Sequence, residues 1–336
     1  MVSIFVTRLV LVRKSYNTTS SNLNMKGPLF YSKILLFGEY GIIKDSKGLS
    51  IPYNFYNGAL KVDENPSDEA VKSNLNLRRF VVYLEQLQEE QSDLVTFNLE
   101  ALKADIERGM YFDSSIPQGY GVGSSGALVA AIYDKYANDK ITVLENLTRE
   151  KLLQLKTIFA QMESFFHGKS SGLDPLNSYL SIPILINSKD NIEATGIPTQ
   201  SANGKGAVFL LDSGIVGETA PMVNIFMENL KDQGFRTMLK NQFVKYTDAC
   251  VENFLGGDLK SLFSNTKKLS KVVLSNFKPM IPEQFHGIWQ KGIDTNDYYL
   301  KLCGSGGGGY ILGFTEDLEK AKQSLKDYKL EVVYQF

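Results

Sequence analysis

Residues 117–133 read PQGYGVGSSGALVAAIY and join a glycine-rich turn directly to a strong helix-forming run. Four glycines fall within eight positions, at 119, 121, 123 and 126, and Ser124 and Ser125 stand where a helix would be capped. Backbone N–H groups and the positive end of the helix dipole attract anions at such a helix start. The stretch therefore predicts a phosphate site that opens a helix over 124–137, and a plain glycine turn with a capping serine is the alternative.

Two common nucleotide motifs do not account for this stretch. The spacing G-x-G-x-x-G occurs at 121, 123 and 126 and again at 304, 306 and 309. A dinucleotide fingerprint requires a strand directly before the glycines and a helix after them, with an acidic residue ~20 positions on. The first occurrence follows DSSIPQ and the second precedes a strand-like run, and the chain has no Walker A loop. A Rossmann-type NAD protein is thus the weaker alternative.

Composition points to a globular protein with a small-molecule partner. The 336 residues suffice for two domains, since single cores usually stop growing before ~250–300 residues. Hydrophobic residues make up 43% and the net charge is −1, which predicts neither a nucleic-acid nor a membrane partner. Cys250 and Cys303 are too far apart for a metal clip, and two histidines argue against zinc. We expect free thiols and a cytoplasmic location.

The first 24 residues, MVSIFVTRLVLVRKSYNTTSSNLN, resemble a targeting signal only superficially. The apolar run is too short to span a bilayer, is interrupted by Arg8, and lacks a basic n-region and a small-residue cleavage site. We expect residues 1–24 to form an irregular extension that is dispensable for the fold.

Periodicity predicts mixed helices and strands. FYSKILLFGEYGII, starting at Phe30, predicts a buried strand that turns at Gly38 and continues past Gly41. The predicted helices cover 67–92, 99–109, 124–137, 148–166, 218–234, 236–255, 257–275 and 316–326. Strands are predicted at SIPILI, GAVFLLDSG and the C-terminal KLEVVYQF. The pattern indicates an α+β protein, with a domain boundary near Lys205 that separates residues 25–204 from 205–336.

Four motifs carry a family resemblance. PQGYGVGSSGA resembles the phosphate loop of the GHMP kinases, and KLCGSGGGGYILGF resembles their third motif. KILLFGEYGII resembles the first motif of the mevalonate kinases, and MESFFHGKSSGLD resembles their segment E-x-x-x-H-G-x-P-S-G-x-D. The resemblance implies a two-domain GHMP kinase fold, with an N-terminal lobe like domain 2 of ribosomal protein S5 and a ferredoxin-like C-terminal lobe.

The same resemblance implies ATP and Mg²⁺ as cofactors. The residues that it assigns to ATP binding are Gly119, Gly121, Gly123, Ser124, Ser125, Gly126, Gly306 and Gly307. Ser125 and Glu163 would hold the Mg²⁺, an ion that prefers oxygen ligands. From the sequence alone, Glu163 would be interpreted as part of a solvated helix face.

The resemblance also assigns the acceptor side. Asp174 matches the residue that accepts the proton of the substrate hydroxyl, and Lys33 matches the lysine beside it. Glu39, Tyr40 and His167 would line the acceptor site. Apart from the resemblance, an Asp in a glycine- and serine-rich turn is more often a surface residue.

The resemblance implies mevalonate as the acceptor. A homodimer is expected from family likeness alone. Tyr40 stands where mevalonate kinases commonly have His, and Ser170 where they commonly have Pro. Phosphomevalonate kinase, homoserine kinase, a sugar 1-kinase and an inactive nucleotide-binding homologue therefore remain as alternatives.

Overall fold

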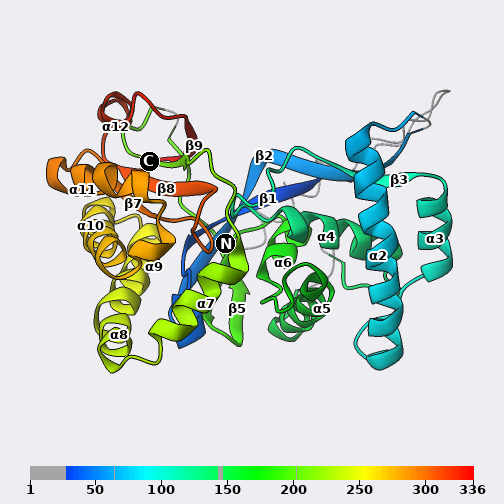
Figure 1. Cartoon of the computed structure of the whole chain (residues 1–336). Coiled ribbons are helices and arrows are strands. Elements are labelled where there is room, and N and C mark those ends of the chain that lie inside the picture. The colour runs from blue at the N-terminus through cyan, green and yellow to red at the C-terminus, as the bar shows by residue number, and fades with distance from the viewer. Residues whose placement is uncertain (1–27, 64, 143–146, 202) are drawn as a thin grey trace.

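The computed structural model describes residues 28–63, 65–142, 147–201 and 203–336 (Figure 1). The predicted extension over 1–24 lies outside the described residues. The first of two sheets is antiparallel and comprises β1 Phe30–Phe37, β2 Gly48–Val62, β3 Met110–Ser114, β4 Ile184–Ser188 and β5 Asn191–Ala194. We call this sheet and its helices the N-terminal lobe.

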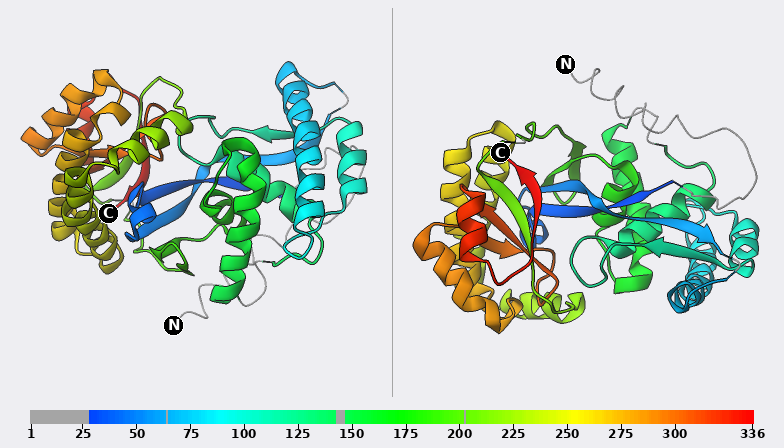
Figure 2. Two further views of the ribbon diagram at one scale, coloured as in Figure 1. Left: turned by 60° about the horizontal axis from the view of Figure 1, so that its bottom comes forward. Right: turned by 90° about the horizontal axis from the view of Figure 1, so that it is seen from above.

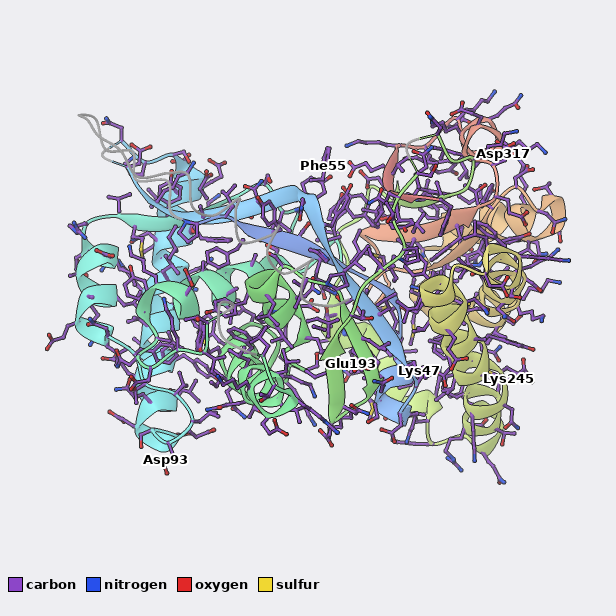
Figure 3. All side chains as sticks on the ribbon, turned by 180° about the vertical axis from the view of Figure 1, so that it is seen from behind. Lys47, Phe55, Asp93, Glu193, Lys245 and Asp317 are labelled. Atoms are coloured by element: carbon purple, nitrogen blue, oxygen red, sulfur yellow. The ribbon has the colours of Figure 1, made fainter. Side chains whose placement is uncertain are left out.

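The long strand β2 organises this sheet. It pairs with β1 over most of its length, with β4 through residues 48–50, and with β3 through residues 58–62. The connection from β1 to β2 reaches across to the other half of the molecule, where the Lys47 amide donates a 2.7 Å hydrogen bond to Asp248 Oδ1. Figure 3 shows Lys47 beside the C-terminal helices. The β1–β2 hairpin is thus shared by both halves.

The helices of the N-terminal lobe, as far as its residues are described, are α2 Asp68–Glu90, α3 Leu99–Glu107, α4 Ser124–Tyr136, α5 Arg149–His167 and α6 Leu173–Leu180. The α4 and α6 helices pack on each other and on β1. Small buried residues of α4, among them Ala127, Ala130 and Ala131, allow this close approach. The N-terminus of α5 is capped by Thr148, whose side chain accepts from the Lys151 N–H.

The C-terminal lobe is built on a second antiparallel sheet in the order β7-β8-β6-β9. Its strands are β6 Ala207–Asp212, β7 Tyr299–Leu302, β8 Tyr310–Thr315 and β9 Leu330–Gln335. Its helices are α7 Thr219–Asn229, α8 Gln233–Met238, α9 Lys245–Gly256, α10 Leu259–Asn276, α11 His286–Thr295 and α12 Leu318–Ser324. Figures 1 and 2 place α8 to α11 at the opposite end of the molecule from α2 and α3.

The α+β prediction is confirmed, with differences in detail. The first strand ends at Phe37 instead of continuing past Gly41, because Gly38 (φ 115°) and Tyr40 (φ 57°) turn the chain into the 3-10 helix Gly41–Lys44. The α6 and α11 helices were not predicted. The chain passes from the first sheet to the second between residues 194 and 207, and a domain boundary at 204/205 within this connection stays a proposal.

Candidate active site

The predicted phosphate loop lies on the first strand. Gly119, Gly121 and Gly123 have φ values of 75°, 78° and 83°, a region that favours glycine. The Lys33 N–H donates a 3.0 Å hydrogen bond to Val122 O and so joins β1 to the loop. The N-cap of α4 is Gly123, with no side-chain cap, so the expected serine cap is wrong. Neither Ser124 nor Ser125 closes this helix end, which leaves its positive dipole available to an anion.

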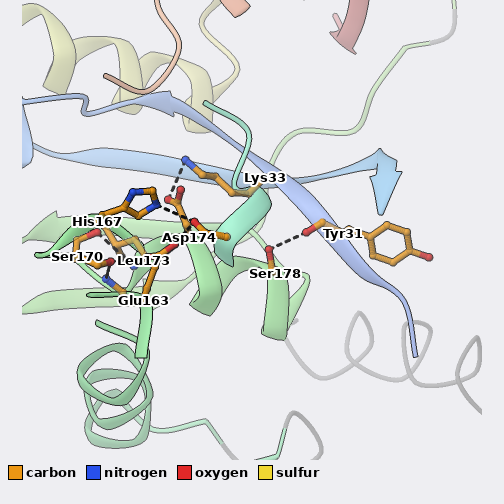
Figure 4. A network of polar contacts seen from close by, with 11 residues as sticks. Tyr31, Lys33, Glu163, His167, Ser170, Leu173, Asp174 and Ser178 are labelled. Carbon is orange, nitrogen blue, oxygen red and sulfur yellow. Dashed lines mark hydrogen bonds and ion pairs between the residues drawn. The ribbon is translucent and has the colours of Figure 1, made fainter. Parts of the chain in front are cut away.

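Lys33 and Asp174 form an ion pair directly beneath this loop. Lys33 Nζ lies 2.9 Å from Asp174 Oδ1, and a Cβ on Gly123 would lie 3.1 Å from Lys33 Cγ. Lys33 is 4% exposed, whereas the Asp174 side chain is 36% exposed. Burial lowers the pKa of Lys33, but the adjacent Asp174 carboxylate outweighs burial and leaves that pKa raised. Lys33 therefore stays an ammonium beside an accessible carboxylate (Figure 4).

Asp174 lies in a helix, which corrects its prediction as a turn residue. It is the second residue of α6, after Gly172, which adopts a left-handed N-cap conformation (φ 72°). Pro175 follows in the first turn of this helix, where the missing N–H of proline does no harm. The helix fixes the Asp174 backbone, so the carboxylate has a rigid support.

Glu163 is the centre of a second polar cluster beside this pair (Figure 4). It is 3% exposed and accepts hydrogen bonds from Ser125 Oγ, at 2.9 Å, and from Ser170 Oγ. His167 Nε2 lies 3.0 Å from Ser125 Oγ, so His167 faces this cluster. Burial raises the pKa of Glu163, and the negative Asp174 adds to the effect, while the serine hydrogen bonds and Lys33 oppose it.

The Ser125 hydroxyl and the Glu163 carboxylate are the chemical types of ligand that Mg²⁺ prefers. Their oxygens converge, as the 2.9 Å hydrogen bond between them shows. Within the described part of the chain, no group of three or more His, Cys, Asp and Glu side chains could hold a metal ion. The residues present thus fit an ion whose remaining ligands come from phosphate and water.

The glycine-rich segment 303–309 packs on the phosphate loop through Gly304 and Gly309. A Cβ on Gly309 would lie 2.4 Å from Tyr120 Cα, and a Cβ on Gly304 would lie 3.2 Å from Gly121 Cα. Gly306 and Gly307, the predicted ATP-binding residues, instead contact Met280, whose carbonyl accepts the Gly307 N–H at 2.7 Å. Sequence spacing could not reveal which glycines of this segment face the loop.

Glu39 and Tyr40, predicted to line the acceptor site, are buried against the C-terminal lobe. Glu39 forms a buried ion pair with Lys301 of β7. The Tyr40 ring packs 4.6 Å from that of Phe226, measured between centroids, and its hydroxyl donates a 2.7 Å hydrogen bond to Ser305 O. Both side chains therefore contact the C-terminal lobe, which gives no support to their predicted place at the acceptor.

Comparison with known proteins gives this geometry a family context. Residues 83–181 match the model of the GHMP kinases N terminal domain. No curated protein matches the sequence at a significant level. Residues 83–181 include the phosphate loop, Glu163 and Asp174, so the family match covers most of the candidate site.

Three solved structures illustrate the similarity. The mevalonate kinase of L. major, in complex with R-mevalonate, has 18% sequence identity and a TM-score of 0.60, covering 94% of this chain and 99% of its own. Methanococcus jannaschii mevalonate kinase has 17% identity and a TM-score of 0.57, covering 94% and 100%. Streptococcus pneumoniae phosphomevalonate kinase, in complex with phosphomevalonate and AMPPNP, has 13% identity and a TM-score of 0.57, covering 92% and 98%.

These findings confirm the resemblance to the GHMP kinases. Residues 83–181 are similar to the GHMP kinase N-terminal domain, and the two-domain α+β fold resembles that of the solved mevalonate kinases. Among the described residues, no helix is both long and apolar enough to cross a lipid bilayer.

Proposed function

We propose that this chain is an ATP-dependent kinase that transfers the γ-phosphoryl group to the 5-hydroxyl of mevalonate and forms 5-phosphomevalonate. The observation that carries the proposal is the Lys33–Asp174 ion pair, 2.9 Å long, beneath a glycine loop that opens a helix. Phosphoryl transfer needs positioning and charge stabilisation more than covalent chemistry from the protein. The Asp174 carboxylate, as a proton acceptor, and the Lys33 ammonium, as a positive charge, lie beside an anion-binding loop and satisfy that need.

The roles of the residues follow from their positions. The Asp174 carboxylate accepts the proton of the attacking hydroxyl, and its exposed side chain leaves room for an alcohol to approach. The Lys33 ammonium, 2.9 Å from Asp174 Oδ1, stabilises the developing alkoxide. The loop amides around Gly121 and Gly123 bind the phosphates.

Ser125 and Glu163 would hold a Mg²⁺ ion, which when bound neutralises charge on the β- and γ-phosphates. His167 orients the Ser125 hydroxyl through their 3.0 Å contact. The predicted place of His167 near the acceptor stays part of the proposal. A homodimer and a cytoplasmic location remain part of the proposal by family likeness alone.

Several acceptors other than mevalonate are compatible with the proposed kinase activity. Phosphomevalonate kinase shares the fold with a TM-score of 0.57, so the same scaffold is compatible with a phosphorylated acceptor. An assay of ATP consumption with mevalonate, phosphomevalonate, homoserine and galactose separates these activities. NMR of phosphorus then locates the transferred group. Turnover with another alcohol and none with mevalonate would refute the specific acceptor and keep the kinase class.

The proposed base is tested by Asp174→Asn. We expect kcat to fall by at least about 100-fold, because the proton acceptor is lost, while MgATP affinity stays within about threefold of wild type. The matched control is Asp113→Asn, which removes the carboxylate of a surface Lys–Asp pair with Lys61 and should leave kcat unchanged. Wild-type kcat in Asp174→Asn would exclude this residue as the base.

Two further outcomes would indicate a protein that is not an active kinase. A protein that binds MgATP and turns over none of the acceptors would be an inactive nucleotide-binding homologue. Protection against thermal unfolding by NAD and not by ATP would indicate a dinucleotide-binding protein.

A further inference from the structure

The chain leaves the N-terminal lobe at Gly38. A Cβ at this position would lie 2.8 Å from Gly48 Cα, and φ is 115°, so glycine alone fits the bend without strain. The bend directs the next two side chains away from the first sheet and toward the C-terminal lobe. Glu39 and Tyr40 follow β1, the strand that carries Lys33, by only a few residues.

Glu39 makes the first of two contacts with the C-terminal lobe. Its carboxylate pairs with the Lys301 ammonium, and the two residues are 6% and 2% exposed. Lys301 also donates a 2.8 Å hydrogen bond to Leu302 O. Removing two charges from water is unfavourable, and apolar side chains of equal volume would hold the lobes together at least as well. An ion pair adds a defined geometry, which fixes how the residues that follow β1 meet β7.

Tyr40 makes the second contact. It has a φ of 57°, which is uncommon for a residue other than glycine, and its ring is buried against Phe226 and Phe277. The ring is held so that its hydroxyl reaches Ser305 O at 2.7 Å. Backbone strain that surrounding packing maintains in this way is typical of positions with a functional constraint.

Both contacts fall on or close to the segment 303–309, which packs against the phosphate loop. Lys301 lies two residues before the segment 303–309, and Ser305 lies within it. The segment meets the loop through backbone atoms at Gly304 and Gly309, and the next residue, Tyr310, donates a 3.3 Å hydrogen bond from its N–H to Tyr120 O. Contacts between backbones cannot adjust by changing rotamer, so the position of the segment depends on what anchors it.

We propose that Glu39 and Tyr40 form a latch between the lobes, which positions the segment 303–309 against the phosphate loop for nucleotide binding. This inference rests on the proposed kinase function. Glu39 and Tyr40 are positioning residues, and they act through Lys301 and the Ser305 carbonyl. The latch replaces the expectation that the two side chains line the acceptor site.

Binding of Mg²⁺ and AMPPNP, measured by calorimetry, tests the latch without requiring turnover. Tyr40→Phe keeps the buried ring and removes the hydrogen bond to Ser305, and we expect AMPPNP affinity to fall roughly 5- to 10-fold. The control is Tyr298→Phe, which removes an equivalent buried hydrogen bond, 2.8 Å long, to Ile288 O. It should lower thermal stability as much as Tyr40→Phe and leave AMPPNP affinity unchanged.

The ion pair is tested by Glu39→Gln and by the double variant Glu39→Met with Lys301→Met. Glu39→Gln should lower AMPPNP affinity about 10-fold or more, because the Lys301 ammonium is left buried without an opposite charge. The double variant should recover wild-type thermal stability, since apolar residues replace both charges, yet keep the lowered affinity. Recovery of both properties would show a purely structural pair and overturn the latch.

Other outcomes are equally decisive. Wild-type AMPPNP affinity in Tyr40→Phe and Glu39→Gln, with acceptor binding weakened instead, would overturn the latch and restore the acceptor-site role. If Glu39→Gln fails to fold, Tyr40→Phe with its control decides alone. If the wild-type protein does not bind AMPPNP, the proposed function and the latch are both overturned. If the wild-type protein and the variants bind AMPPNP equally well, the latch alone is overturned.

Discussion

Gly126 is the point where the helix of the phosphate loop touches the helix that carries Asp174. A Cβ on Gly126 would lie 2.7 Å from the Asp174 carbonyl carbon and 2.8 Å from the Pro175 nitrogen. Ordinary contacts begin at 3.4 Å, so the start of α6 would have to retreat by about 0.7 Å, the difference between 3.4 and 2.7 Å. Both obstructing atoms belong to the backbone and cannot rotate away. Gly126→Ala therefore tests whether α6 positions the Asp174 carboxylate, the proposed base.

The expected effects on stability and on rate differ in size. Overpacking costs about 1–3 kcal/mol, and alanine regains ~1 kcal/mol over glycine within a helix, so the net loss of stability is about 0–2 kcal/mol. A displacement approaching 1 Å of a catalytic group can lower the rate by about 100-fold. We expect a folded variant whose kcat is reduced some 30- to 100-fold, as ~0.7 Å predicts on that scale.

Steady-state kinetics and urea unfolding, measured on the same preparations, separate the two effects. The control is Gly287→Ala, in the first turn of α11, where a Cβ meets nothing within 4 Å. Its stability should rise slightly and its kcat should not change. A kcat for Gly126→Ala within twofold of wild type would refute the role given to the α4–α6 contact. So would a loss of activity that the unfolded fraction explains completely.

Two further predictions concern buried acids. Burial raises the pKa of Glu163. The charged Glu163 therefore makes the native state less stable once the pH exceeds the ordinary pKa of a glutamate. At pH 8 without metal, Glu163→Gln should unfold at or above the temperature at which wild type unfolds. The same variant should need about 10-fold more Mg²⁺ for half-maximal activity, and unchanged Mg²⁺ dependence would remove Glu163 from the metal site. At Asp105, burial raises the pKa, but hydrogen bonds from Lys135, Tyr136 and Arg108 outweigh it and lower the pKa from 3.8 to about 2. The lowered pKa contributes up to about 2 kcal/mol to the free energy of unfolding above pH ~4, and this contribution is lost as the pH falls toward 2. The free energies of unfolding of wild type and Asp105→Asn should therefore converge between about pH 4 and pH 2. A difference that stays constant over this range would contradict the prediction.

The sequence alone determined the parts of this protein that depend on neighbouring residues. The glycine loop, the helix that follows it and the apolar stripe of α5 were predictable, because backbone freedom and helical periodicity are local properties. The likeness of four motifs to those of the GHMP and mevalonate kinases implied Lys33, Glu163 and Asp174 as site residues, and the structure brings Lys33 and Asp174 to 2.9 Å.

The tertiary structure decided everything that depends on what a side chain meets across the molecule. The α6 helix forms from a segment that was predicted as a turn, and burial against α4 and β1 supplies the stabilisation that its short length lacks. Glu39 and Tyr40 adjoin the first strand in sequence but bond to Lys301 and Ser305, more than 260 positions away. No local pattern contains such a partner, since only the bend at Gly38 and the docking of the two lobes bring these residues together.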